Sequence, residues 1–250
     1  MTMSSPGLST RARAVLAVCA LLACAAVSAQ EAVIRKNLTD RLPTLPKIDE
    51  VSRTPMAGVF EVRFGGTEIL YTDANGDYVL AGAALIDTKT RTDLTEARIN
   101  KLQAVDFDKL PLKDALVFKQ GNGARKMAVF ADPNCGFCKR FERDIAGMKD
   151  ITIYAFLVPI LGADSATKSR DIWCAKDAGR AWRAWMIDNV LPTKSAPACD
   201  SAAIERNLDF AKKNRINGTP VTFFEDGSRK VGALSVEALD KLLAAAARKN

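Results

Sequence analysis

Two cysteines separated by two residues, in Cys135-Gly136-Phe137-Cys138, constrain what this chain can fold into more than any other feature. The pair follows the apolar run 127–131, which is typical of a buried strand, and opens the segment 135–148, which we expect to be helical. Unpaired backbone N–H groups and the positive end of the helix dipole stabilise a thiolate at a helix N-terminus. We therefore expect Cys135 to be more acidic than a free thiol. Cys138, one turn deeper, can reach Cys135 and is expected to be the sheltered thiol, as disulfide exchange requires.

The first 29 residues have the pattern of a secretory signal. Arg11 and Arg13 precede the apolar run 14–29, and the small residues at its end predict cleavage before Gln30. Cleavage would leave 221 of the 250 residues and lower the net charge from +7 to +5. The stretch that ends at Cys24 loosely matches a lipobox, so a lipid-anchored form is a minor alternative.

Export would leave four of the six cysteines, and an even number in an oxidising compartment favours disulfides. Half of a zinc site and an inert structural disulfide are the alternatives for the close pair. Zinc would require a second close pair or histidines, whereas Cys174 and Cys199 have 24 residues between them and the chain contains no histidine. We therefore expect no metal and no cofactor, and chemistry that uses no histidine base.

The overall composition is that of a folded globular protein, with 48% apolar and 26% charged residues. Basic residues are scattered among acids with few aromatics between them, and no run of five or more basic residues occurs. We therefore expect no nucleic acid as a partner.

The N-terminal part has the pattern of a small α+β domain. Helical spacing over 31–42 is followed by strict alternation in 59–64, which predicts a half-buried strand. Gly65-Gly66 and Asn75-Gly76 predict turns, with strands at 67–72 and 77–85. A meander of about 60 residues is near the lower limit for an independent core, and dimerisation would relieve that shortage.

The C-terminal part has the order strand, helix, strand. Beyond a helical linker, strands are predicted at 115–118, 127–131 and 151–158, and an uninterrupted apolar strand that leads into a helix suggests a buried, partly parallel sheet. The domains we expect are a signal peptide at 1–29, an N-terminal domain at 30–92, the linker at 93–113 and a catalytic domain at 114–250. Within the last, a helical insert is expected at about 163–212, followed by strands at 221–224 and 229–231 and a helix from Ser235.

Three sequence segments resemble the DsbC/DsbG family of periplasmic thiol:disulfide interchange proteins. They are Phe130-Ala131-Asp132-Pro133-Asn134-Cys135-Gly136-Phe137-Cys138, Ile172-Trp173-Cys174-Ala175-Lys176-Asp177 and Gly218-Thr219-Pro220. The likeness covers nearly the whole mature chain and is greater to the DsbC branch, although Phe137 stands where that branch usually has Tyr. It implies a mixed α+β and α/β chain: a thioredoxin-like fold with a helical insertion, preceded by a small cystatin-like α+β dimerisation domain and a helical linker.

The resemblance also implies roles for single residues. Cys135 and Cys138 would be catalytic, and Gly136, Phe137, Thr219 and Pro220 would bind substrate, with the Thr219-Pro220 bond cis and the backbone of Thr219 available to an extended segment. Cys174 and Cys199 would form a structural disulfide, which in the chain-entropy picture contributes about 3 to 4 kcal/mol.

The function implied is a periplasmic disulfide isomerase with chaperone-like substrate binding. Its partners would be a second copy of the chain, misfolded disulfide-containing periplasmic proteins, and a membrane reductase of the DsbD type. Two alternatives remain: a DsbG-like reductase of single sulfenylated cysteines, and a non-catalytic chaperone that holds unfolded chains.

Other residues near the motif allow less specific expectations. Asp132 could tune the thiol, but a capping role before the helix is favoured. Lys139 could support the thiolate by charge or could be an ordinary surface lysine. Trp173, Trp182 and Trp185 are expected in the core or interfaces of the helical insert.

Overall fold

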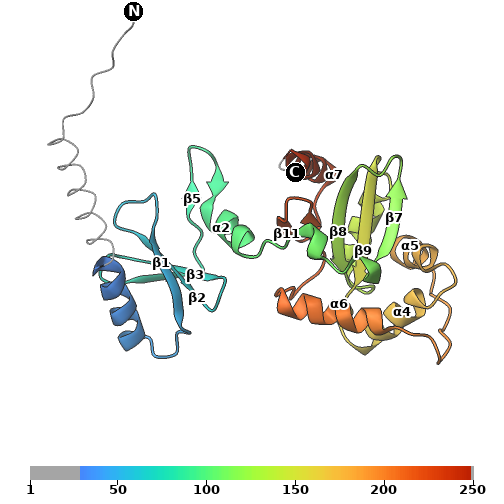
Figure 1. Cartoon of the computed structure of the whole chain (residues 1–250), viewed down its shortest axis with the longest axis horizontal. Coiled ribbons are helices and arrows are strands. Elements are labelled where there is room, and N and C mark those ends of the chain that lie inside the picture. The colour runs from blue at the N-terminus through green and yellow to red at the C-terminus, as the bar shows by residue number, and fades with distance from the viewer. Residues whose placement is uncertain (1–28, 249–250) are drawn as a thin grey trace, which may run out of the picture. The chain divides into compact units, whose positions relative to one another are not determined.

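The computed structural model describes residues 29–248, which form two compact units divided after Leu102 (Figure 1). The predicted signal peptide, except for its last residue, lies outside the described residues, as does Cys24. Within 29–248, no helix is both long enough and apolar enough to cross a membrane. The two units are described separately.

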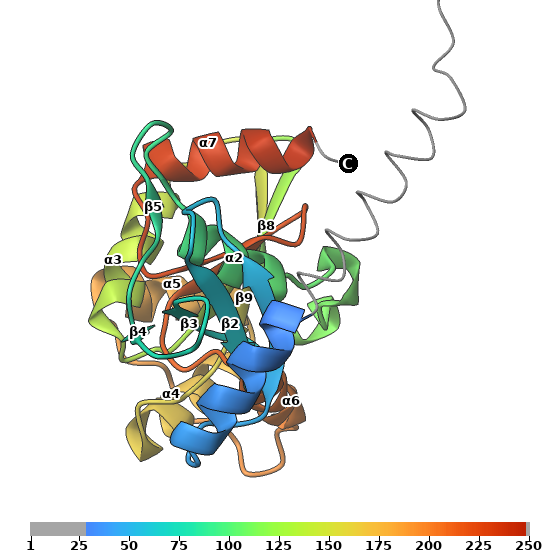
Figure 2. The same ribbon diagram turned by 90° about the vertical axis from the view of Figure 1, so that its left-hand side faces the viewer.

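The N-terminal unit packs a helix over residues 29–41 against an antiparallel sheet (Figure 2). The strands follow one another in chain order across the sheet: β1 (Ile48–Arg53), β2 (Phe60–Phe64), β3 (Glu68–Thr72) and β4 (Val79–Ala81). The alternation predicted for 59–64 is confirmed, since Phe60 and Val62 are buried and pack with Ile34 and Leu38 of the helix. Burial of this apolar stripe against the sheet holds the small core together.

The last strand of this sheet is shorter than expected. The strand predicted over 77–85 is wrong in extent, because β4 contains only Val79–Ala81 and Gly82 follows with a φ of +67°, outside the extended region. The side chains of β4 are exposed, so no buried face prolongs the strand. A small hairpin of β5 (Ile86–Asp87) and β6 (Thr92–Asp93) then leads into α2 (Leu94–Leu102).

The linker expected to be helical over 93–113 forms an α-helix only in its first part. Asp93 Oδ1 accepts a hydrogen bond from the backbone N–H of Glu96 at 2.8 Å, which fixes the start of α2, and the helix ends at Leu102. Phe107 lies instead in the short 3-10 helix η1 (Phe107–Lys109) and is buried in the core of the C-terminal unit. Phe107 therefore packs in that core and does not continue α2.

The C-terminal unit is built on a mixed sheet with the strand order β11-β10-β8-β9-β7. Its strands are β7 (Leu116–Gln120), β8 (Arg125–Ala131), β9 (Ile151–Leu157), β10 (Val221–Phe224) and β11 (Arg229–Val231). The parallel pairing predicted around the cysteine motif is confirmed between β8 and β9, while the other neighbours pair antiparallel. The central strand β8 leads directly to the motif.

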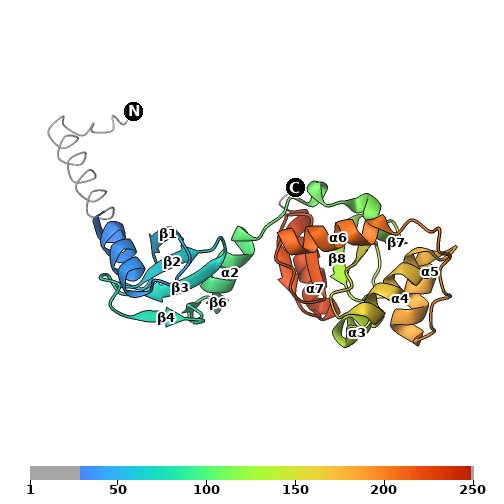
Figure 3. The same ribbon diagram turned by 90° about the horizontal axis from the view of Figure 1, so that it is seen from below.

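Helices cover both faces of this sheet (Figure 3). One face carries α3 (Gly136–Ile145), α4 (Ala163–Trp173), α5 (Ala178–Asp188) and α7 (Val236–Ala247), and the other carries α6 (Ala202–Lys213) with the segment before β7. Phe130 anchors the second face, stacked on Phe156 and Phe210 at centroid distances of 4.5 and 5.2 Å. Strands β8 and β9 therefore run between two apolar layers, which explains their continuous hydrophobic sequence.

The helical insert contains α4, α5 and α6, with an irregular loop at 189–201 between the last two. Helix α5 ends because Asn189 adopts a left-handed conformation with a φ of +57°. The helical insert expected at about 163–212 is therefore not helical in this loop. Trp182 is fully buried in the core, as expected, whereas Trp173 and Trp185 are partly buried against it.

Candidate active site

The cysteine pair lies where β8 ends and α3 begins. Cys135 is the residue that caps the N-terminus of α3, and its Sγ accepts a hydrogen bond from the backbone N–H of Cys138 at 3.4 Å. A sulfur in this position takes the place of the serine or aspartate oxygen that commonly caps a helix. The first turn of α3 therefore directs a backbone N–H group toward the sulfur of Cys135.

A distant loop completes the site. The Thr219-Pro220 peptide bond is cis, as the resemblance implies, and the Cys135 thiol donates to the carbonyl oxygen of Thr219 across 3.3 Å. Pro220 directly precedes β10, which is the neighbour of β8 in the sheet. Pairing of these two strands is what places residues 219 and 220 beside the cysteines.

The two thiols differ less in exposure than the sequence predicts. Both are free in the structure, but Cys135 is only 8% exposed and Cys138 is 2% exposed. Phe137, between them, is 62% exposed. Burial raises the pKa of the Cys138 thiol far above its ordinary range, so this group stays protonated at neutral pH.

Asp132 is fully buried and organises the loop before the cysteines. Its carboxylate accepts hydrogen bonds from the backbone N–H of Asn134 at 2.7 Å, from the backbone N–H of Leu161 at 2.9 Å and from Ser165 Oγ at 2.8 Å. Its backbone carbonyl accepts from the N–H of Cys135 at 3.1 Å. The expected capping role of Asp132 is wrong for α3, because Cys135 is the cap of that helix and the Asp132 carboxylate instead joins the loop before the motif to Leu161 and to Ser165 of α4.

Lys139 and Trp185 link α3 to α5 beside the motif. Lys139 Nζ lies 3.6 Å from the centroid of the Trp185 ring and donates to Asn189 Oδ1 at 2.7 Å. The indole N–H of Trp185 donates to the carbonyl of Pro133 at 2.7 Å. Burial, with the nearby cations of Lys168 and Arg143, lowers the pKa of Lys139. Lys139 is therefore a packed, paired side chain and not a freely solvated surface lysine.

Sequence reasoning missed three contributors to this region. Ser165 of α4 contacts Asp132 and Asn189, just after α5, contacts Lys139, and no local pattern marks either residue. Glu142 is buried on the same face of α3 as Cys138, one turn further on, and burial raises the pKa of its carboxyl. The spacing of four residues between Cys138 and Glu142 was the available signal for that placement.

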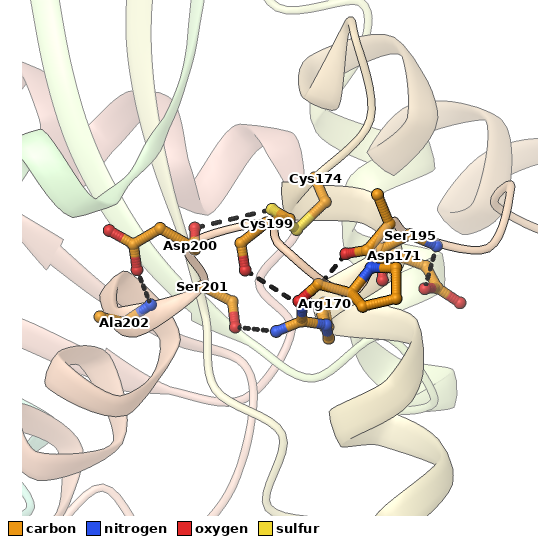
Figure 4. The surroundings of a disulfide bond; sticks show 10 residues. Arg170, Asp171, Cys174, Ser195, Cys199, Asp200, Ser201 and Ala202 are labelled. Atoms are coloured by element: carbon orange, nitrogen blue, oxygen red, sulfur yellow. Dashed lines mark hydrogen bonds between the residues drawn. A yellow bond between two sulfur atoms is a disulfide. The ribbon is translucent and has the colours of Figure 1, made fainter.

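The second cysteine pair forms a disulfide at the end of α4 (Figure 4). Cys174 and Cys199 have Cα atoms 6.0 Å apart, and the bond ties the irregular loop 189–201 to the helix. Arg170 supports the same loop by donating to the carbonyls of Pro197 and Cys199 and to Ser201 Oγ, at 2.9, 3.0 and 2.7 Å. Within 29–248, no cluster of three or more side chains of the types that bind metals occurs.

A CxxC pair at a helix start, beside a cis-proline that directly precedes the neighbouring strand of a thioredoxin-like sheet, defines the class of thiol:disulfide interchange proteins. Comparisons with known families agree: residues 112–247 match the thioredoxin-like domain and residues 25–96 match the N-terminal domain of disulfide bond isomerase proteins. The chain belongs to the DsbC family of these enzymes.

Individual relatives support this membership. The chain is 45% identical over 196 residues to a probable thiol:disulfide interchange protein DsbC of Bordetella parapertussis, covering 78% of this chain and 68% of that one. It is 26% identical over 187 residues to DsbC of Escherichia coli K12, covering 73% and 75%. Among solved structures, a disulfide interchange protein from Neisseria gonorrhoeae has a TM-score of 0.51 at 33% identity, covering 54% of this chain and 97% of that one.

Proposed function

We propose that this protein is a disulfide isomerase that reshuffles non-native disulfides in exported proteins, with Cys135 as the nucleophile. The observation that carries the proposal is the arrangement of the two sulfurs. Cys135 Sγ caps α3 and lies next to the Thr219 carbonyl, while Cys138 is almost completely buried behind it. The family membership and the N-terminal domain match support the same activity.

The reaction is thiol–disulfide exchange. The Cys135 thiolate attacks one sulfur of a substrate disulfide, so that a mixed disulfide forms and the other substrate sulfur leaves as a thiolate. A substrate thiolate then attacks the mixed disulfide, forms a new substrate disulfide and returns Cys135 as a thiolate. No net oxidation or reduction occurs, and substrate and enzyme end with the electrons they began with.

Cys138 provides an escape from a stalled mixed disulfide. After losing its proton, Cys138 attacks Cys135, which releases the substrate as a dithiol and leaves the enzyme oxidised. The raised pKa of the buried thiol keeps this step slow, which gives the substrate time to rearrange. A membrane reductase of the DsbD type is the proposed donor of the two electrons that restore the pair.

Substrate binding is proposed to use the exposed surface of the motif and the cis-proline loop. Gly136 and Phe137 are exposed beside the buried sulfurs, so Phe137 offers an apolar contact to an unfolded chain. The backbone of Thr219, before Pro220, would pair with an extended segment in the manner of an added strand.

A homodimer is proposed through the N-terminal unit. Strand β4 lies at the edge of its sheet, and its neighbourhood exposes Tyr78, Val79 and Leu80. An exposed apolar edge strand is a template for pairing with another chain, and a second copy would cover it. Two catalytic units held together would also supply the chaperone-like binding of unfolded chains.

We propose that the protein works in the periplasm. The signal pattern at 1–29 supports export, and the Cys174–Cys199 disulfide suits an oxidising compartment. Anchoring through a lipid on Cys24 remains the minor alternative from the sequence.

Refolding of scrambled ribonuclease tests the isomerase proposal. The protein with its active pair reduced should accelerate recovery of ribonuclease activity, and the Cys135→Ser variant should give only the uncatalysed rate. The Cys138→Ala variant should retain shuffling at first and accumulate mixed disulfides on Cys135. If wild type and Cys135→Ser refold ribonuclease equally, the proposal is wrong. A protein that reduces a sulfenylated cysteine rapidly but fails with scrambled ribonuclease would favour the reductase alternative.

A further inference from the structure

A cavity of about 600 Å³ lies away from the CxxC pair, between the α4–α5 turn, the first half of α5 and the loop 189–196. Its size is within the range of pockets that bind peptides or small ligands. None of Cys135, Cys138, Thr219 and Pro220 lines it. The cavity is therefore distinct from the candidate active site.

Most of the charged side chains that line the cavity are cationic. Lys176, Arg180 and Lys194 line it, and within 29–248 none of these side chains takes part in an ion pair. The lining carboxylate, Asp177, uses Oδ1 to cap α5 by accepting from the backbone N–H of Arg180 at 2.9 Å. The cavity therefore has an excess of positive charge that a carboxylate-bearing ligand would neutralise.

Apolar side chains lie beside these cations. Val190 and Leu191 line the cavity and are highly exposed, Leu191 by 70%, and Ala181 and Ala184 of α5 contribute small apolar contacts. Exposed leucine and valine side chains next to unpaired cations form a surface that is apolar and positive at once. Such a surface is complementary to a segment in which acidic and apolar residues are interspersed.

The wall formed by loop 189–196 is held in place although it has no regular secondary structure. Buried Asp171 accepts from the backbone N–H of Ser195 through Oδ1 at 2.8 Å, and Arg170 donates to the carbonyl of Ala196 at 3.2 Å (Figure 4). The disulfide at Cys174, which itself lines the cavity, closes the far end of the loop. A fixed wall reduces the entropy lost when a ligand binds.

We propose that this cavity binds an acidic, apolar segment of a polypeptide, as a second docking site besides the active site. The lining cations are exposed and come from two separate segments, 176–180 and 194, so they do not enclose a compact inorganic anion. An extended chain with several carboxylates can reach both segments while its apolar side chains cover Val190 and Leu191. The site goes beyond the proposed isomerase activity, because it needs neither thiol.

Binding of a cysteine-free peptide tests the proposal. The probe alternates glutamate with leucine and serine, and its control has glutamine in place of each glutamate. Both are titrated by calorimetry into the full chain carrying Cys135→Ser and Cys138→Ser. The result then depends neither on thiol chemistry nor on whether the proposed isomerase activity is correct. The acidic peptide should bind, its affinity should fall as salt is raised, and the glutamine peptide should bind about tenfold more weakly.

Paired substitutions locate the binding. Arg180→Gln with Lys194→Gln should weaken binding of the acidic peptide about tenfold. Lys212→Gln with Lys213→Gln, exposed residues of α6 outside the cavity lining, removes the same charge and should leave binding unchanged. Equal affinities in the two double variants, or equal affinities of the acidic and glutamine peptides, would overturn the proposal.

A second measurement does not depend on these variants. The acidic peptide carries a photoreactive group in this experiment. It should cross-link to residues 190–196 and to the start of α5 in the full chain that carries only Cys135→Ser and Cys138→Ser. Cross-links confined to Phe137 and the Thr219 loop would show that the peptide occupies the active site, and would overturn the proposal equally.

Discussion

The thiol of Cys135 and the carbonyl oxygen of Thr219 lie 3.3 Å apart although 84 positions separate the two residues in the chain. Strand pairing between β8 and β10 creates this contact, because it joins the end of one strand to the start of the other. The contact places the proposed nucleophile, Cys135, against backbone that is proposed to receive an extended substrate. It also covers the sulfur, which explains why Cys135 is nearly as buried as Cys138.

Burial of Cys138 predicts a loss of stability in alkali. The folded-state pKa of this thiol lies above the unfolded value, so its contribution is complete below about pH 8.5 and is lost as pH rises above that value. Between about pH 8.5 and pH 10, the reduced wild type should lose roughly 2 kcal/mol more unfolding free energy than Cys138→Ala. Urea unfolding across this range measures the difference, and parallel curves for the two proteins would contradict it.

Replacement of Asp132 by asparagine should destabilise the fold. An amide can accept at one oxygen only, and its NH₂ group would face one of the donors that the carboxylate now receives from Asn134, Leu161 and Ser165. We expect Asp132→Asn to cost about 2 kcal/mol in urea unfolding. Asp144→Asn, at an exposed carboxylate of α3, is the matched control and should change stability by less than about 0.5 kcal/mol.

Loss of the hydrogen bond between Trp185 and Pro133 should loosen the segment before the cysteines. The indole N–H donates to the Pro133 carbonyl at 2.7 Å, and Trp185→Phe leaves that acceptor without its donor. The expected cost is about 1 to 1.5 kcal/mol by chemical denaturation. Trp173→Phe, at a partly buried tryptophan packed against the same core, serves as the control for loss of ring size. A smaller effect at position 185 than at 173 would show that the hydrogen bond contributes little.

The disulfide between Cys174 and Cys199 should contribute strongly to stability. Its loop is long enough for a chain-entropy contribution of about 3 to 4 kcal/mol, which the Cys174→Ala, Cys199→Ala double variant would lose. Differential scanning calorimetry of both proteins, with the active pair reduced, gives the comparison. An unchanged melting temperature would show that Arg170 and Asp171 alone hold the loop.

A charge on the exposed edge strand should separate the proposed dimer. Leu80 is 61% exposed on β4, so Leu80→Asp leaves the core of the N-terminal unit unchanged and places a desolvated charge in any interface formed there. Sedimentation equilibrium should show a dimer for wild type and a monomer for the variant. Lys47→Asp, before the opposite edge strand β1, is the control and should remain dimeric.

The sequence predicted the parts of the fold that depend on local pattern. Alternation over 59–64 and the continuous apolar strand before Cys135 both appear as strands, because burial on one face or on two imposes those patterns directly. Element ends were less predictable. Strand β4 stops after Ala81 and α2 stops at Leu102, since both ends depend on what the tertiary structure buries and not on local propensity.

For the candidate site, the sequence by itself determined the chemistry: two thiols at CxxC spacing, at a helix start, in a chain without histidine. Tertiary structure alone decided what surrounds them, including the Thr219 carbonyl, Ser165 and the pairing of Lys139 with Asn189. Spacing along the chain fixes which groups a helix turn brings together, over distances of three or four residues. Contacts across dozens of residues follow from how strands pair and helices pack, and no local pattern records them.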